Sequence, residues 1–140
     1  MVGSKIVYWD SSALIATLFN EANTEQARTL AAAAGTHLMS SLAWAELHAV
    51  LARARQEPGV AITAVDAAQS ALQVGPWTYV NALPGQAVVR SVAQRWPLRG
   101  ADLWHLALAK TLHENLPEMC FATYDHALAH AAAGEGFATP

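Results

Sequence analysis

The chain has 140 residues, of which 54% are apolar and 14% are charged, and its formal net charge is −3. This length fits one domain with a single core, and the apolar content excludes an intrinsically disordered chain. The net charge decides nothing about a nucleic-acid partner: if four of the eleven acids formed one metal-binding pocket, the remaining surface would be nearly neutral.

The cellular compartment is predicted from three features: the number of cysteines, the length of the apolar runs and the residues near the N-terminus. Cys120 is the only cysteine, so no internal disulfide can form and a reducing compartment fits. No apolar run reaches the ~18 residues of a membrane span, and Asp10 interrupts the stretch that a signal peptide would need. We therefore expect a cytoplasmic protein without membrane contact. The small number of charges also predicts an apolar surface that a partner or a second copy covers.

Strand and helix patterns alternate along the chain. In chain order the sequence predicts a strand over 5–9, a helix that starts at Ser11 or Ser12 and includes 13–19, a helix over 24–34, a strand over 36–39, a helix from 40 that is stopped at 57–59, a helix over 64–74, a strand over 77–80, helices over 85–96 and 101–114, a strand over 119–123, a helix over 125–133 and a candidate strand over 136–139. This order is typical of an α/β fold, here a single domain over 1–140 with a parallel sheet of four to five strands flanked by helices.

Glu46 lies on an otherwise apolar face of its predicted helix. In the stretch SSLAWAELHAVL, residues 40–51, Leu42 and Val50 fall on the same stripe. A carboxylate there loses solvation and needs a partner. The alternatives are an ion pair, to Arg53 or Arg99, and a bound cation.

Three aspartates lie where ligands bind in parallel sheets, beyond the strand ends or near helix starts. Asp10 follows the first predicted strand, Asp102 opens a helix and Asp125 follows the strand over 119–123. Each of them is also placed to cap a helix, and that reading stays open for each taken singly. All four acids together would repel one another without a cation, whereas Mg²⁺ prefers carboxylate and water oxygens. We therefore predict that Asp10, Glu46, Asp102 and Asp125 bind metal.

Four segments resemble, in order, the acidic motifs of the PIN-domain ribonucleases, in particular the VapC-type toxins of bacterial toxin–antitoxin pairs. These segments are VYWDSSALIATLF, SSLAWAELHAVLAR, LRGADLWHLALAK and FATYDHALAHAAAGEGF, and they extend from residue 7 to residue 137. The small polar residue after the first acid corresponds to Ser12, and the hydroxyl before the last acid corresponds to Thr123. Many members carry a further acid after the last one, but His126 and Ala127 stand there in this chain.

The resemblance implies a PIN fold and an endoribonuclease that uses Mg²⁺ or Mn²⁺. The four acids would be its catalytic and metal-binding residues, positioning the ions so that a metal-activated water cleaves RNA in line. The resemblance also implies a cognate antitoxin protein and a homodimer.

Further polar residues lie close to these acids in the sequence. His105 is one helical turn after Asp102 and either touches the pocket or the substrate, or is structural. Arg99 is expected to contact a phosphate. The pair His126 and His130 is expected at the surface because no third metal ligand is evident. The five tryptophans are expected mainly in the core or in an interface.

Two other functions compete with the nuclease. A degenerate PIN domain would bind RNA or protein without catalysis, although the complete set of four acids disfavours it. A phospho-acceptor receiver domain also has an acidic pocket in a small α/β fold. It is disfavoured because Asp10 has no acidic neighbour in the sequence and the only lysines are Lys5 and Lys110.

Overall fold

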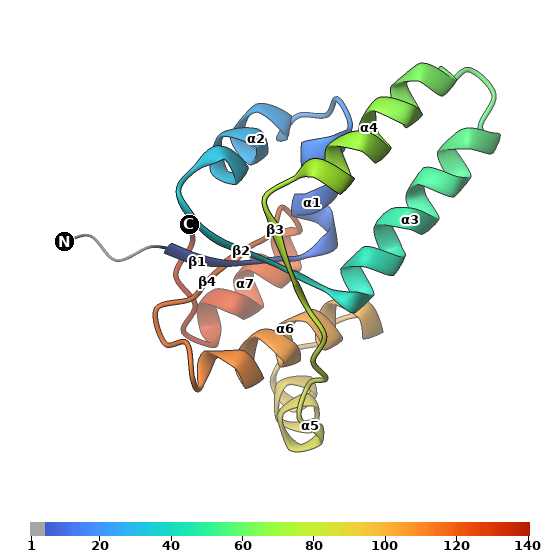
Figure 1. Ribbon diagram of the computed structural model, residues 1–140. Coiled ribbons are helices and arrows are strands. Elements are labelled where there is room, and N and C mark those ends of the chain that lie inside the picture. Colours follow the sequence, from blue (N-terminus) through green and yellow to red (C-terminus); the bar gives the residue numbers. More distant parts are fainter. Residues whose placement is uncertain (1–4) are drawn as a thin grey trace.

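Four parallel strands form the centre of the molecule, which we describe from a computed structural model (Figure 1). The structure describes residues 5–140, so the first four residues of the predicted domain lie outside the described residues. The sheet has the order β3-β2-β1-β4. The strands are β1 (Lys5–Trp9), β2 (Gly35–Ser40), β3 (Trp77–Val80) and β4 (Cys120–Ala122).

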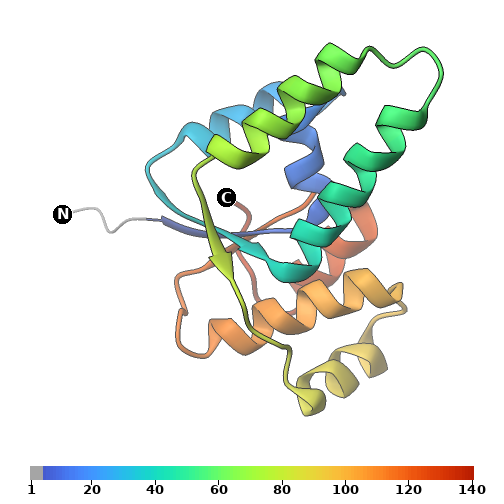
Figure 2. The same ribbon diagram turned by 45° about the vertical axis from the view of Figure 1, so that its right-hand side comes forward.

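Seven helices connect and cover these strands within the described residues. They are α1 (Ser11–Leu18), α2 (Thr24–Ala32), α3 (Ser41–Gln56), α4 (Ile62–Val74), α5 (Gln86–Arg95), α6 (Gly100–His113) and α7 (His126–Gly134). Helices α1 to α4 lie on one face of the sheet, and α5 to α7 lie on the other (Figures 1 and 2). Helices α3 and α4 extend side by side beyond the sheet as a long hairpin.

Strand β1 contributes to a core on each face of the sheet. Val7 and Trp9 pack with the helices of the first face, and Tyr8 packs with those of the second. Side chains of a strand alternate between its faces, so a strand covered on both sides must be apolar throughout. This explains why the run KIVYW carries no alternation of polar and apolar residues after its first position.

The predicted fold class is confirmed: the chain forms a single α/β domain with a four-stranded parallel sheet flanked by helices. Every predicted helix is present, with ends that shift by a few residues. The candidate strand over 136–139 is wrong. The backbone turns at Gly136 (φ +93°), and this segment meets β4 through the hydrogen bond from Phe121 N–H to Ala138 O, 3.1 Å.

The order of the strands locates the site. The chain moves outward from β1 to β2 and β3 with crossover helices on one face, and then returns to β4 through helices on the other face. The direction of winding therefore changes between β1 and β4, where open α/β sheets bind their ligands. Asp10 lies there, and its N–H donates to Ala122 O at 3.1 Å.

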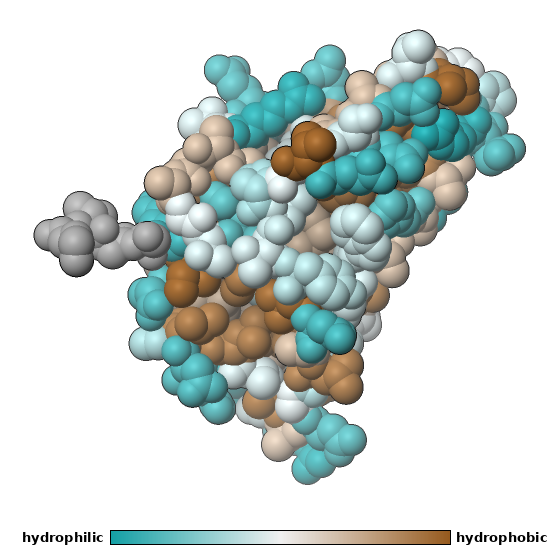
Figure 3. All heavy atoms as spheres, in the orientation of Figure 1, coloured by the Kyte–Doolittle hydropathy of each residue, from teal (hydrophilic) through white to brown (hydrophobic). Residues whose placement is uncertain are grey.

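Exposed apolar side chains remain despite the two cores. Tyr79 on the edge strand β3 is 54% exposed and Leu83 is 78% exposed. On the face shown in Figure 3, apolar surface gathers over the lower half of the molecule, while the helices above are largely hydrophilic. In residues 5–140 no helix has both the length and the apolar character to cross a bilayer.

Candidate active site

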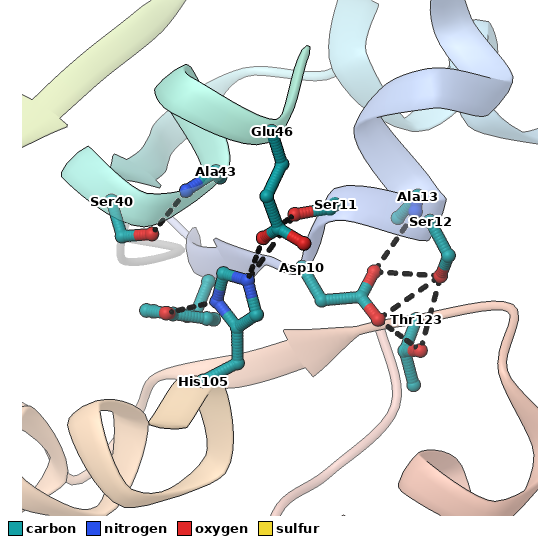
Figure 4. Close-up of polar contacts among 10 residues, drawn as sticks. Asp10, Ser11, Ser12, Ala13, Ser40, Ala43, Glu46, His105 and Thr123 are labelled. Carbon is teal, nitrogen blue, oxygen red and sulfur yellow. Dashed lines mark hydrogen bonds and ion pairs between the residues drawn. The ribbon is translucent and has the colours of Figure 1, made fainter. Parts of the chain in front are cut away.

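Asp10 is buried at the end of β1, and hydrogen bonds surround its carboxylate. Its Oδ1 accepts from Ala13 N–H at 2.9 Å, which caps α1. Ser12 Oγ lies 2.8 Å from Oδ1, and Thr123 Oγ1 donates to Oδ2 at 2.5 Å (Figure 4). Ser12 and Thr123, the two hydroxyl residues that the resemblance places near the first acid, therefore both contact Asp10. Their hydrogen bonds join α1 to the end of β4.

Burial raises the pKa of the Asp10 carboxyl, and the hydrogen bonds from Thr123, Ala13 and Ser12 oppose that shift. The net direction is upward because the side chain is only 2% exposed and no lysine or arginine pairs with it in the described part of the chain. The protein thus keeps a poorly solvated carboxylate without a basic partner, an arrangement that a cation would stabilise.

Glu46 is the end of a second network, beside the first (Figure 4). Its Oε1 accepts from Ser11 Oγ at 2.6 Å and lies 2.9 Å from His105 Nε2. His105 Nδ1 lies 2.8 Å from the hydroxyl of Tyr8. With Nε2 carrying the proton, Tyr8 donates to His105 and His105 donates to Glu46, so the chain of donors ends at the carboxylate.

This network favours the ionised form of Glu46. The hydrogen bond from His105 lowers the pKa of the Glu46 carboxyl more than burial raises it, and the hydrogen bond from Ser11 lowers it further. Within residues 5–140, Oε1 takes both hydrogen bonds and Oε2 takes none. Neither Arg53 nor Arg99 forms the ion pair considered as the alternative for this residue.

Asp102 lies in the first turn of α6, one turn before His105. Unlike Asp10 it does not cap its helix, and in the described residues its carboxylate makes no hydrogen bond or ion pair. Burial raises its pKa, and the negative charges of Asp125 and Glu46 raise it further. The charges of both other acids therefore reach the Asp102 carboxyl.

Asp125 follows β4 and caps α7, because its Oδ1 accepts from Leu128 N–H at 2.9 Å. The capping reading therefore holds for Asp10 and Asp125 and fails for Asp102. A cap uses one lone pair of one oxygen, so it leaves carboxylate oxygen available for other ligands.

The donor chemistry of this edge fits a hard divalent cation, since it combines carboxylates whose mutual repulsion and burial still raise the pKa of Asp102 although His105 and Arg99 act to lower it. The four acids do not form a compact set as they stand: across residues 5–140, no three His, Cys, Asp or Glu side chains are grouped closely enough to hold a metal ion. Separate hydrogen bonds hold Asp10 and Glu46, as Figure 4 shows.

The remaining predicted residues are either buried at the site or exposed at the surface. His105 contacts the site through its hydrogen bond to Glu46, but it is buried, at 1% exposure. Arg99 is exposed at the start of α6, and its charge acts weakly to lower the pKa of Asp102. His126 and His130 are at the surface as expected.

Sequence reasoning missed Ser11 and Tyr8. Ser11 was considered only as a helix start, and its hydroxyl bonds Glu46. Tyr8 is a fully buried strand residue, and the apolar residues around it in the sequence do not indicate His105 as the partner of its hydroxyl. A signal did exist for Tyr8: a buried phenol needs a polar partner.

The fold and this edge define a class: an α/β domain in which a parallel sheet carries acidic residues from several elements at the carboxyl ends of its strands. A family model described as "PIN domain" matches residues 7–134, so the chain belongs to the PIN domain family. Members of this family are generally nucleases, and those nucleases generally use divalent metal ions. A search of curated proteins found no match.

Proposed function

We propose that this PIN domain is a Mg²⁺- or Mn²⁺-dependent endoribonuclease and acts as the toxin of a VapC-type toxin–antitoxin pair in the cytoplasm. The observation that carries the nuclease proposal is the set of under-compensated carboxylates at the β1/β4 edge of a PIN fold. The toxin role is supported by the four sequence segments that resemble the VapC motifs. The buried free thiol of Cys120 agrees with a reducing compartment.

Each acid has a part in this proposal. Asp10, at the centre of the edge, and Glu46, through the oxygen that carries no hydrogen bond, would hold the ions, and Asp102 and Asp125 would complete the ligand set. A bound divalent ion supplies a hydroxide from its coordinated water and offsets negative charge on the leaving oxygen. Ser12 and Thr123 keep the Asp10 carboxylate in place by donating to it. Arg99 is exposed and free to meet a phosphate of the substrate.

The first test is the Asp10→Asn variant, assayed on single-stranded RNA with Mn²⁺. We expect cleavage to fall at least about 100-fold, because the amide is a poor ligand for a divalent ion. The fold should persist, since Asn keeps the acceptor for Ala13 N–H and removes a charge whose burial is unfavourable. The matched control is Asp66→Asn, on the exposed surface of α4, which should retain full activity. Equal cleavage by Asp10→Asn and wild type would contradict the proposal.

A second readout does not depend on cleavage. Mn²⁺ should raise the melting temperature of wild type and leave that of Asp10→Asn nearly unchanged, because a ligand stabilises only the state that binds it. Ca²⁺ should also bind but support less cleavage than Mn²⁺, which separates metal binding from catalysis. An identical response of both proteins to Mn²⁺ would remove Asp10 from the ligand set.

The non-catalytic alternative retains one supporting observation, the absence of a compact ligand group in residues 5–140. It predicts RNA binding without cleavage in either metal. The receiver alternative has less support: Lys110 Nζ lies 3.3 Å from Glu135 Oε1, and Lys5 begins β1 at the edge of the sheet opposite Asp10. Neither lysine is placed to assist phosphorylation of Asp10.

The proposed antitoxin and homodimer would cover apolar surface. Tyr79 on the edge strand β3 and Leu83 shortly after it are exposed. Figure 3 shows further apolar surface on the lower half of the molecule. Light scattering on the purified chain at micromolar concentration tests the dimer. A mass near 14.9 kDa would contradict it.

A further inference from the structure

A hollow of about 180 Å³ opens directly beside the candidate carboxylates. Its lining residues are Asn23, Thr123, Tyr124, Asp125, His126 and Ala129. Thr123 also donates to Asp10, and Asp125 is one of the four acids, so the hollow and the acidic edge share a wall. A substrate whose phosphate meets the carboxylates would therefore bring a neighbouring group to this hollow.

We propose that this hollow, called the base subsite below, binds the nucleobase of a nucleotide adjoining the scissile phosphate. The proposal rests on the nuclease function proposed above and adds a determinant of sequence preference to it. A protein that reads single-stranded RNA needs such contacts, because its sequence is read from unstacked bases.

The charge of the lining favours a base over a phosphate. Asp125 and His126 are the only ionisable side chains of the lining besides the Tyr124 phenol, and no lysine or arginine contributes. A phosphate there would face the Asp125 carboxylate, whereas a nucleobase is neutral. The volume also favours a base, because 180 Å³ lies below the ~300 Å³ at which pockets for larger organic ligands begin and suits a single ring system.

Asn23 supplies the polar contact. It occupies the residue before α2, where an asparagine side chain usually caps the helix, but its side chain makes no such hydrogen bond. In the described residues its amide has no other hydrogen-bond partner, so its carbonyl and its NH₂ group are both available at the hollow. One side chain with a donor and an acceptor can bond two neighbouring atoms on the edge of a base.

Tyr124, which also packs against the first core, contributes an aromatic residue to the lining, and RNA bases commonly stack on such side chains. Its segment is held firmly: Tyr124 N–H donates to Ser12 Oγ at 3.0 Å, and Asp125 N–H donates to Thr123 Oγ1 at 3.1 Å. Ala129, also in the lining, has only a methyl group and takes up little of the space. The subsite is therefore fixed relative to Asp10, which a base-reading contact requires.

The first experiment measures cleavage of short single-stranded RNAs that differ in one base beside the cut. Wild type should prefer one base at one flanking position. Asn23→Ala and Tyr124→Leu should reduce that preference at least about fivefold and leave preferences at other positions unchanged. The matched control is Asn20→Ala, an exposed asparagine in the same loop but outside the hollow, which should keep the wild-type profile. Equal melting temperatures would show that the variants are folded.

The second experiment needs no cleavage. Amide NMR signals of wild type are followed while adenosine, cytidine, guanosine, uridine or inorganic phosphate is added. We expect a nucleoside to shift the signals of Asn23 and Ala129, and to do so less in Tyr124→Leu.

The outcomes separate the two proposals. If Asn23→Ala and Tyr124→Leu cleave with the wild-type profile, the base subsite is overturned while the nuclease stands. If wild type cleaves no RNA but nucleosides shift these signals, the nuclease fails together with the role in cleavage preference, and base binding at the hollow stands. Shifts with inorganic phosphate alone, or with none of the probes, would overturn the base subsite.

Discussion

Two donors reach one oxygen of Glu46, and both come from residues that are themselves anchored. Ser11 begins α1, and His105 is oriented by the hydroxyl of Tyr8 at its other ring nitrogen. The tautomer of a histidine is set by the hydrogen bond at the opposite nitrogen. Tyr8 is thus a positioning residue for Glu46, two hydrogen bonds away from it.

The Tyr8→Phe variant tests this relation. Without the hydroxyl, His105 is free to place its proton on Nδ1, and Glu46 loses a donor. We expect the Mn²⁺ concentration needed for half-maximal cleavage to rise about 10- to 100-fold, as is usual when an outer partner of a metal ligand is removed. The matched control is Tyr79→Phe on the exposed edge strand. An unchanged Mn²⁺ dependence in Tyr8→Phe would show that the hydroxyl does not act through Glu46.

At the scale of residues, the sequence predicted which side chains lie at the site better than it predicted which of them contact each other. Glu46 is predicted from its carboxylate on an apolar stripe, and Asp10 from its position directly after a strand. His105 is predicted from its position one helical turn after Asp102. Helical periodicity alone does not separate Ser11 from Ser12, because both follow the strand directly and lie about 100° apart around the helix. The resemblance, in contrast, assigns Ser12 to the site. In the structure Ser12 bonds Asp10 and Ser11 bonds Glu46.

At the scale of elements, Glu135 joins the three helices on one face of the sheet. It lies just after α7 and accepts hydrogen bonds from Arg95 at the end of α5 and from Trp96 next to it. Lys110 of α6 lies 3.3 Å from its Oε1. Gly134 before it is also required, because a Cβ there would lie 2.3 Å from the Trp96 ring.

Arg95, more than any other group, lowers the pKa of Glu135 from 4.5 to about 2. A carboxyl with a depressed folded-state pKa contributes stability that is full above about pH 4.5 and is lost as the pH falls towards about 2. Glu135→Gln should lower the unfolding free energy at pH 7 by about 1–3 kcal/mol, less than the full shift implies because Arg95 is half exposed. Urea unfolding at pH 7 and pH 3 measures this loss of stability. The difference in unfolding free energy between wild type and Glu135→Gln should be smaller at pH 3 than at pH 7.

The control for this change is Glu118→Gln, an exposed glutamate without an ion-pair partner in the described residues, which should change little at either pH. A difference between wild type and Glu135→Gln that stays constant between pH 7 and pH 3 would show that the carboxylate charge is not what holds these helices.

The elements themselves could be predicted because their signals are local. Strand patterns, prolines and N-caps lie within a few residues of the ends they determine, so the predicted helices and four strands are present. The strand over 136–139 was wrongly predicted because local signals alone were used: Phe137 and its neighbours have the composition of a short strand. In the structure Phe137 is buried in the second core, and Gly136 turns the backbone. Tertiary packing, not local propensity, decided that segment.

For the molecule as a whole, the order of the strands could not be predicted. Alternating strands and helices imply a parallel sheet, but the position of β4 beside β1 depends on which face each crossover covers. That choice brings Thr123 into contact with Asp10, a residue more than 110 positions away in the chain. The sequence pattern predicted which residues belong to the site, whereas only the topology shows how they meet.

The two cores should unfold together, because β1 belongs to both. Val7 and Trp9 face one core and Tyr8 the other, so neither face can lose its packing while β1 stays in place. Leu14→Ala in the first core and Leu106→Ala in the second remove fully buried side chains, and each should lower the unfolding free energy by about 2–5 kcal/mol.

Both variants should shift one common urea transition without changing its slope. Circular dichroism and tryptophan fluorescence can follow it, since Trp9 and Trp77 report on the first core and Trp96 and Trp104 on the second. Two separate transitions, each sensitive to one variant, would contradict the prediction of a single domain. One transition would mean that the edge bearing Asp10 and Asp125 exists only while both faces of the sheet are covered.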